Sequence, residues 1–298
     1  MVVLFLTVMI AMILIRNLRK DIAQYNDPAS LEEAKEESGW KLVHGDVFRP
    51  PQTAPMLLSV FVGTGVQLFA MSLFTLTCSV VGLLSPTNRG SIATGFILLF
   101  VFMGAYAGYH SSTCYKMFRG LEWKTNTLLT AFLYPGTVFI VVGIINLVLW
   151  MEGSSGALPF GIFFTLLFLW FCVSVPLVFL GSFYGYKGEI EPFPVRTNQI
   201  PRQIPEGPWY LNPIITSMIG GILPFAAVSV ELYFIMSALW LHQIFYIFGF
   251  LVLVLLVLVV TCAEISILLC YIHLCNEDYN WWWRAFFSSG SCAIYMIL

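Results

Sequence analysis

The sequence predicts an all-α protein, a polytopic bundle of transmembrane helices. Hydrophobic residues make up 59% of the 298 residues and charged residues only 10%, whereas about a quarter of an ordinary soluble domain is charged. Apolar runs long enough to cross a hydrocarbon core, which takes roughly 20 residues, recur along the chain. The net charge of −2 provides no basic surface for nucleic acid, so that class of partner is excluded.

Eight apolar runs divide the chain. Six are complete spans, over residues 56–84, 92–114, 127–150, 158–186, 213–240 and 244–274. The runs 1–15 and 285–298 are shorter, reach only about 21–22 Å as helices and are interpreted as incomplete first and last spans. Basic residues follow the first run, the reverse of a signal peptide. We therefore expect a partial first helix over 1–15, a cytosolic loop over 16–55, and a multi-helix transmembrane domain over 56–298 with a cytosolic loop at 187–212.

The basic residues predict the orientation of the bundle. Of the 14 Lys and Arg residues, all but Arg89 lie in four alternate segments, residues 16–55, 115–126, 187–212 and 275–284. Basic residues favour cytosolic loops. The sequence therefore predicts a lumenal N-terminus and places those four segments on the cytosolic side.

Two glutamates are the candidate intramembrane polar sites. Glu231 and Glu264 lie well inside complete spans, where an ionisable group is costly unless it is paired, hydrated or neutralised. Their depths differ by about 15 Å at 1.5 Å per residue, so we expect no direct carboxyl pair. Either each is satisfied structurally, with Gln67 and Asn146 as polar candidates at similar depth, or the two form stations on a proton path.

Small residues one helical turn apart mark two candidate packing faces. Gly104 and Gly108 form one pair, and Gly181 and Gly185 form the other. Such spacing lets a second backbone approach closely. The partner is either another helix of the same bundle or a transmembrane helix of a cargo protein.

Catalytic and metal-binding signatures do not occur in the sequence. We find no nucleophile with its base, no phosphate-binding glycine loop and no paired catalytic carboxylates. His273, Glu277 and Asp278 lie near two cysteines, but without the spacing of a known metal motif. The sequence therefore predicts no catalytic residue, no metal, no cofactor and no enzyme.

Two polar phrases in predicted cytosolic loops are the most distinctive part of the chain. They read GWKLVHGDVFRPP at 39–51 and PVRTNQIPRQIP at 194–205. Prolines favour extended structure in the second phrase. The phrases are either stiff connectors over the bundle or surfaces for a partner or lipid headgroup, and the candidate interaction residues are Trp40, His44, Asp46, Arg49, Arg196, Asn198, Gln199 and Arg202.

Three consecutive tryptophans occupy the turn before the last apolar run. Trp281, Trp282 and Trp283 lie where a cytosolic turn re-enters the bilayer, a position that amphipathic rings prefer. We interpret them as interfacial anchors rather than as a ligand cage.

These phrases carry a family resemblance. Together with SSGALPF at 154–160, WYLN at 209–212, FGF at 248–250 and EDYNWWWR at 277–284, they resemble the transmembrane 9 superfamily, the nonaspanins. The resemblance implies a lumenal N-terminal domain, nine spans and a cytosolic tail with retention signals. Measured against that pattern, we expect this chain to lack the lumenal domain, parts of the first and eighth spans, the ninth span and the tail.

The resemblance also implies a function and partners. It indicates a multi-pass protein of Golgi and endosomal membranes, embedded in the lipid bilayer, that sorts other membrane proteins, notably those with glycine-rich transmembrane segments. Coat or trafficking proteins would bind the missing tail. The competing hypothesis is a proton- or solute-coupled transporter that uses Glu231 and Glu264.

Overall fold

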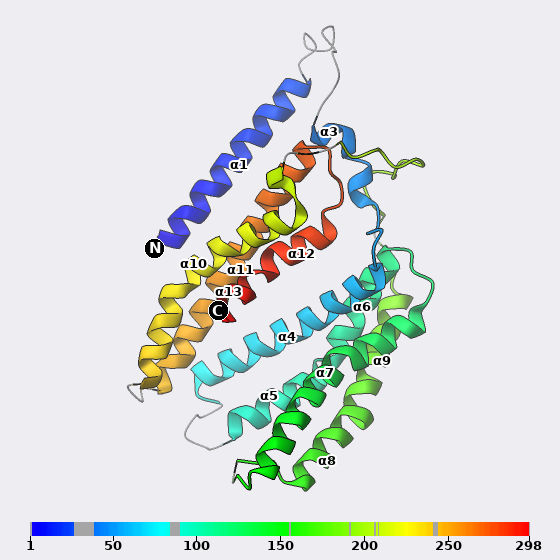
Figure 1. The fold of residues 1–298 in the computed structure, drawn as a ribbon. Helices are drawn as coiled ribbons and strands as arrows, with labels where there is room; N and C mark the ends of the chain where they lie inside the picture. The colour runs from blue at the N-terminus through cyan, green and yellow to red at the C-terminus, as the bar shows by residue number, and fades with distance from the viewer. Residues whose placement is uncertain are drawn as a thin grey trace. The chain divides into compact units, whose positions relative to one another are not determined.

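The computed structural model describes residues 2–26, 39–83, 90–154, 156–190, 192–205, 207, 209–240 and 244–297. The described residues form helices and connecting segments, without a strand among them. They divide into two compact units, unit 1 with residues 1–49 and 193–298 and unit 2 with residues 50–192. Figure 1 shows the helices of both units, and each unit is described by itself below.

Six described helical segments are long and apolar enough to cross a membrane, and they follow the six complete spans predicted from the sequence. They are Pro55–Val81, Ser91–Met117, Trp123–Met151, Phe160–Lys187, Pro213–Ala238 and Ile247–Cys275. Helix ends agree with the apolar runs because a backbone in lipid must satisfy its hydrogen bonds within the helix. The first and last apolar runs are not among these six, so the eight-span arrangement and the lumenal N-terminus remain predictions.

Unit 2 is a bundle built around helix α6. Its helices are α4 (Pro55–Val81), α5 (Ser91–Phe102), α6 (Gly104–Met117), α7 (Trp123–Met151), α8 (Phe160–Leu169) and α9 (Val175–Lys187). Helix α6 contacts α4, α7 and α9. It can do so because small residues line its sides and leave room for neighbouring backbones.

Two of the unit 2 spans contain local breaks. Met103 separates α5 from α6 within the second span, although its N–H still donates to the Leu99 carbonyl at 2.8 Å. A π-helical turn, η2 (Trp170–Ser174), joins α8 to α9 just before Pro176. Proline has no N–H and its ring crowds the carbonyl four residues earlier. The wider turn before Pro176 is a common way for a helix to accommodate these two constraints.

Unit 1 combines the N-terminal helix with the last third of the chain. It contains α1 (Val2–Asn26), α3 (Trp40–Val43), the 3₁₀ turns η1 (Asp46–Phe48) and η3 (Trp209–Leu211), α10 (Pro213–Trp240), α11 (Ile244–Cys275), α12 (Trp282–Gly290) and α13 (Cys292–Ile297). Helix α1 continues through the basic residues that follow the first apolar run and contacts α11. The hydroxyl of Tyr271 on α11 donates to Oδ2 of Asp21 on α1 at 2.8 Å.

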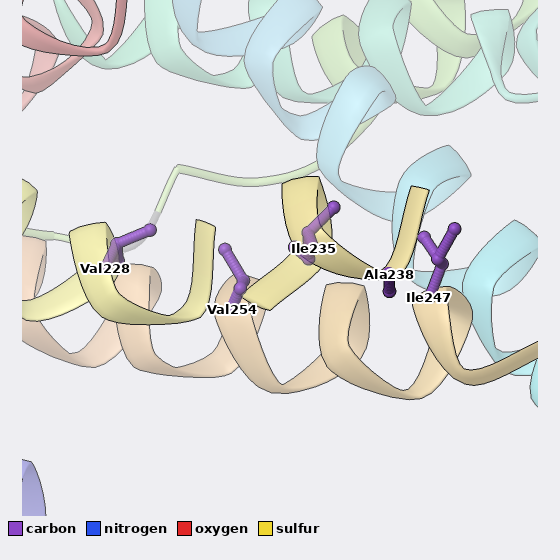
Figure 2. Close-up of a cluster of buried hydrophobic side chains, with 5 residues drawn as sticks. All are labelled: Val228, Ile235, Ala238, Ile247 and Val254. Atoms are coloured by element: carbon purple, nitrogen blue, oxygen red, sulfur yellow. The ribbon is translucent and has the colours of Figure 1, made fainter. Parts of the chain in front are cut away.

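Helices α10 and α11 form an antiparallel hairpin that carries the hydrophobic core of unit 1. Figure 2 shows Val228, Ile235 and Ala238 of α10 meeting Ile247 and Val254 of α11. All five side chains are buried. Their packing joins the two long helices along one seam, and other side chains such as Tyr233 and Leu256 remain exposed.

Helices α12 and α13 pack against α10 at a pair of glycines. A Cβ on Gly220 would lie 3.0 Å from the Ser288 Cβ, and one on Gly221 would lie 2.6 Å from the Cys292 backbone nitrogen. The Ser291 hydroxyl donates to the Ser217 carbonyl at 2.6 Å. Because these helices meet backbone to backbone, a larger residue at Gly221 would force them apart.

Candidate functional site

The two polar phrases predicted to face the cytosol come together in unit 1 around Asp46, whose side chain is fully buried. Asp46 Oδ1 accepts a bond from Arg49 Nη2 at 2.7 Å, and its Oδ2 accepts one from Asn198 Nδ2 at 3.3 Å. The same Arg49 nitrogen donates to the Asn198 carbonyl at 2.8 Å. We call Asp46, Arg49 and Asn198 the Asp46 cluster, and it joins segments about 150 residues apart in the sequence through charge-assisted hydrogen bonds.

Two of the three consecutive tryptophans also hydrogen-bond to the first phrase. The indole of Trp281 donates to the Val47 carbonyl at 3.0 Å, and that of Trp282 donates to the Arg49 carbonyl at 2.8 Å. Their rings are stacked with centroids 4.0 Å apart. These bonds give Trp281 and Trp282 a specific structural role, while the predicted membrane-interface position of the tryptophans is untested.

A second polar group lies at the end of α11. Arg202 forms an ion pair with Glu277 at 2.9 Å, and the Gly39 backbone N–H donates to the other Glu277 oxygen at 3.4 Å. Nearby, Arg284 pairs with Asp278 and donates to His273 Nδ1 at 2.9 Å. The Arg202–Glu277 pair connects the EDYNWWWR segment to the second polar phrase, 75 residues earlier, whereas the Arg284–Asp278 pair lies within that segment.

The other candidate interaction residues lie apart from these groups. His44 is exposed and hydrogen-bonds the Lys41 carbonyl through Nδ1 at 2.7 Å. Arg196 and Gln199 have exposed side chains, although the Arg196 carbonyl closely approaches Gly45. Trp40 begins α3, which contacts α11, and Trp283 stacks on Phe287 at 5.5 Å.

Glu231 and Glu264 each keep one carboxylate oxygen enclosed without a hydrogen-bond partner in the described part of the chain. Gln67 and Asn146, the polar candidates named from the sequence, form hydrogen bonds to other groups. Gln67 donates a hydrogen bond to the Phe100 carbonyl at 2.7 Å. The side-chain oxygen of Asn146 accepts a hydrogen bond from the Leu158 backbone N–H at 2.7 Å. An enclosed polar oxygen that receives no hydrogen bond is costly to bury.

The two glycine faces pack against each other inside unit 2. A Cβ on Gly108 would overlap the backbone of Val178, and one on Gly181 would overlap the Ala105 carbonyl. Gly104 faces Val178 and Ser174, while Gly185 faces Ser112 and Tyr109. The seam between α6 and α9 is thus filled by this chain itself, and a cargo helix could use it only if α6 and α9 separated.

Unit 2 also contains a buried hydrogen-bond network that was not predicted from the sequence. Asn126, which is fully buried, accepts a bond from Ser59 at 2.8 Å and donates to Ser111 and to the Tyr186 hydroxyl, both at 3.2 Å. These side chains come from α4, α7, α6 and α9, and Thr127 adds a bond to Ser182 at 2.6 Å. The run of polar residues at 124–127 is the one sequence feature that could have indicated this network. The partners of Asn126 are serines and a tyrosine within helices, which no sequence pattern sets apart.

Known proteins resemble this chain along its whole length. The Endomembrane protein 70 family matches residues 1–298. Transmembrane 9 superfamily member 10 of Arabidopsis thaliana is 56% identical over all 298 residues of the chain, which is 47% of that relative. Members 2 of Mus musculus and 4 of Homo sapiens are 54% and 50% identical over 297 residues, 45% and 46% of their lengths.

The chain therefore spans about half the length of the curated relatives it matches. No solved structure matches it. The family match covers the polar phrases, the six apolar helices and the EDYNWWWR segment alike, because it runs from the first residue to the last. This chain is a multi-pass membrane protein that belongs to the Endomembrane protein 70 family, the family of the Transmembrane 9 superfamily proteins.

Proposed function

We propose that the protein is a non-enzymatic sorting factor of Golgi and endosomal membranes that retains or delivers other membrane proteins through helix contacts within the bilayer. Family membership supports the membrane setting. The partners we propose are membrane proteins, including those with glycine-rich transmembrane segments, and the contacts would be van der Waals packing between helices in lipid.

The observation that carries this proposal is an exposed apolar face on the second half of α7. Ile140, Ile144 and Leu147 are each about three-fifths exposed. The polar residues of α7 that take part in the buried network, Asn126, Thr127 and Thr130, all lie in its first half. The second half of α7 thus offers an apolar helical face of the kind that a second transmembrane helix can cover.

A photo-reactive aliphatic amino acid tests this face. Placed at Ile144, it is expected to cross-link another membrane protein in intact cells, because no helix of unit 2 covers that side chain. The matched control is Val178, an aliphatic position that is only 3% exposed and faces Gly104. There we expect cross-links to α6 of the same chain. Recovery of only lipid and self cross-links from Ile144 would count against the proposal.

The rival function is a proton- or solute-coupled transporter, and the unpartnered oxygens of Glu231 and Glu264 are the observation that favours it. The double variant Glu231→Gln, Glu264→Gln separates the two functions, with exposed Glu152→Gln as control. We expect compartment pH, solute flux and surface delivery of cargo to remain unchanged. Altered flux with normal delivery would instead assign transport to this protein.

A further inference from the structure

Helix α1 carries a group of basic side chains where its apolar part ends. Arg16, Arg19 and Lys20 are exposed, and they follow apolar side chains such as Met12 and Ile15 that are more than half exposed. The three basic residues are spaced i, i+3 and i+4, positions that share one side of a helix. Within the described part of the chain, no ion pair neutralises any of them. We call Arg16, Arg19 and Lys20 the basic face of α1.

The opposite side of α1 packs against α11. Thr7, Ile10, Leu14 and Asp21 are half-buried, whereas every residue between them is exposed. Their spacing places them on one side of the helix, and the hydrogen bond from Tyr271 to Asp21 holds that side against α11. At 3.6 residues per turn, the centre of the basic face lies about 150° around the helix from Asp21. The basic face therefore points away from α11, the helix with which α1 packs.

The bond between Asp21 and Tyr271 also sets the height of the basic face in the bilayer. Helices α1 and α11 run in the same direction (Figure 1), and Tyr271 lies one turn before Cys275, where the apolar segment of α11 ends. That segment has 29 residues and a length of about 43 Å, which matches a bilayer together with its headgroup layers. The basic residues precede Asp21 by at most five positions, about 8 Å along the helix axis. Their long side chains can therefore reach the headgroup layer while the helix backbone lies beside the acyl chains.

We propose that the basic face of α1 binds the headgroups of anionic phospholipids such as phosphatidylserine. Two guanidinium groups and one ammonium group offer three positive charges to lipid phosphates and carboxylates. A zwitterionic headgroup has no net charge, so its attraction to this face is weaker. The exposed apolar side chains of Met12 and Ile15 lie next to the acyl chains of the same lipid. The basic residues also predict a cytosolic position for this segment, and the cytosolic leaflet is the anionic one.

Photo-labelling of the full chain in lipid nanodiscs tests the proposal. Two preparations are compared, one with photo-reactive phosphatidylserine and one with an equal amount of photo-reactive phosphatidylcholine, in otherwise identical neutral lipid. We expect phosphatidylserine to label residues 12–20 more strongly than phosphatidylcholine. The ratio of the two labelling yields should fall about fivefold with each charge that Arg16→Gln, Arg19→Gln and Lys20→Gln remove, until the two lipids label equally.

The matched control keeps the charge at the same positions. The double variant Arg16→Lys, Arg19→Lys is expected to retain the preference for phosphatidylserine, and its loss there would contradict recognition by charge. All three basic side chains are exposed, so neither set of substitutions disturbs the packing of α1 on α11.

Equal labelling of residues 12–20 by the two lipids in the wild-type chain would overturn the proposal, as would an unchanged ratio in the triple Gln variant. The nanodiscs contain no other protein, so absence of a lipid preference would assign the basic face to an acidic protein partner instead. A second measurement needs only the wild-type chain. Raising the salt concentration is expected to lower the ratio, because salt screens exposed charges, and a ratio that salt leaves unchanged would contradict the assignment.

Discussion

At the scale of single residues, Asp46 decides how the first polar phrase is held. Its carboxylate is fully buried and accepts from both Arg49 and Asn198. A buried charge is tolerated when it is paired and hydrogen-bonded. Arg49 and Asn198 hold the Asp46 side chain, and the indoles of Trp281 and Trp282 donate to the Val47 and Arg49 carbonyls of the same loop.

Replacing Asp46 by Ala is expected to lower the free energy of unfolding by about 2 kcal/mol, the magnitude of a hydrogen bond to a charged group. The physical reason is that Arg49 and Asn198 lose their shared acceptor. Thermal unfolding of the purified chain in detergent measures the change. His44→Ala, an exposed position in the same phrase, serves as control and should unfold like the wild type. Equal midpoints for the two variants would show that the Asp46 cluster does not stabilise the fold.

At the scale of helices, glycine position controls which helices can touch. Gly108 and Gly181 lie where α6 and α9 meet backbone to backbone, whereas Gly65 on α4 has open space around it. The same residue type therefore has opposite consequences at these positions. Only close approach makes a side chain intolerable.

Gly181→Ala is expected to destabilise unit 2 by about 1–3 kcal/mol, the usual cost of overpacking, because the added methyl would overlap the Ala105 carbonyl. Gly65→Ala, the matched control in another helix, should be neutral or stabilising by up to about 1 kcal/mol through helix propensity. Resistance to proteolysis during heating compares the two. A Gly181→Ala chain as resistant as the wild type would show that the seam between α6 and α9 can accommodate an added methyl group.

At the scale of the whole molecule, the distribution of basic residues predicts which loops share a side of the membrane. Gln199 lies in a segment predicted to be cytosolic, and Glu152 follows α7 in a loop predicted to be lumenal. Both side chains are exposed. The predicted orientation therefore places the exposed Gln199 on the cytosolic side and the exposed Glu152 on the lumenal side.

Single cysteines at these positions test the orientation. In sealed Golgi vesicles whose cytosolic face is outward, Gln199→Cys is expected to react with a membrane-impermeant maleimide. Glu152→Cys is expected to react only after permeabilisation, because the bilayer separates the reagent from that loop. The parent chain, with its seven native cysteines, provides the background. Reaction of Glu152→Cys in sealed vesicles would reverse the orientation.

Much of the helix plan could be predicted from the sequence because it depends on local properties. The length of an apolar run determines whether a helix can cross the bilayer, and the six predicted spans end within a few residues of the observed helices. Family membership was likewise predicted from short phrases such as those around Asp46 and Trp282 and is confirmed over the full chain. Local breaks at Met103 and before Pro176 lie within spans and left their apolar character unchanged.

The candidate sites depend on contacts between distant segments. Asp46 and Asn198 are 152 residues apart, and neither phrase contains a pattern that predicts contact with the other. The same holds for Gly108 with Val178 and for Asn126 with Ser59, whose residue types are common in any helix. The sequence by itself determined the membrane class, the helices and the family, since those follow from composition and order along the chain. Only the tertiary structure decided which polar and glycine residues meet, because that depends on how the helices pack.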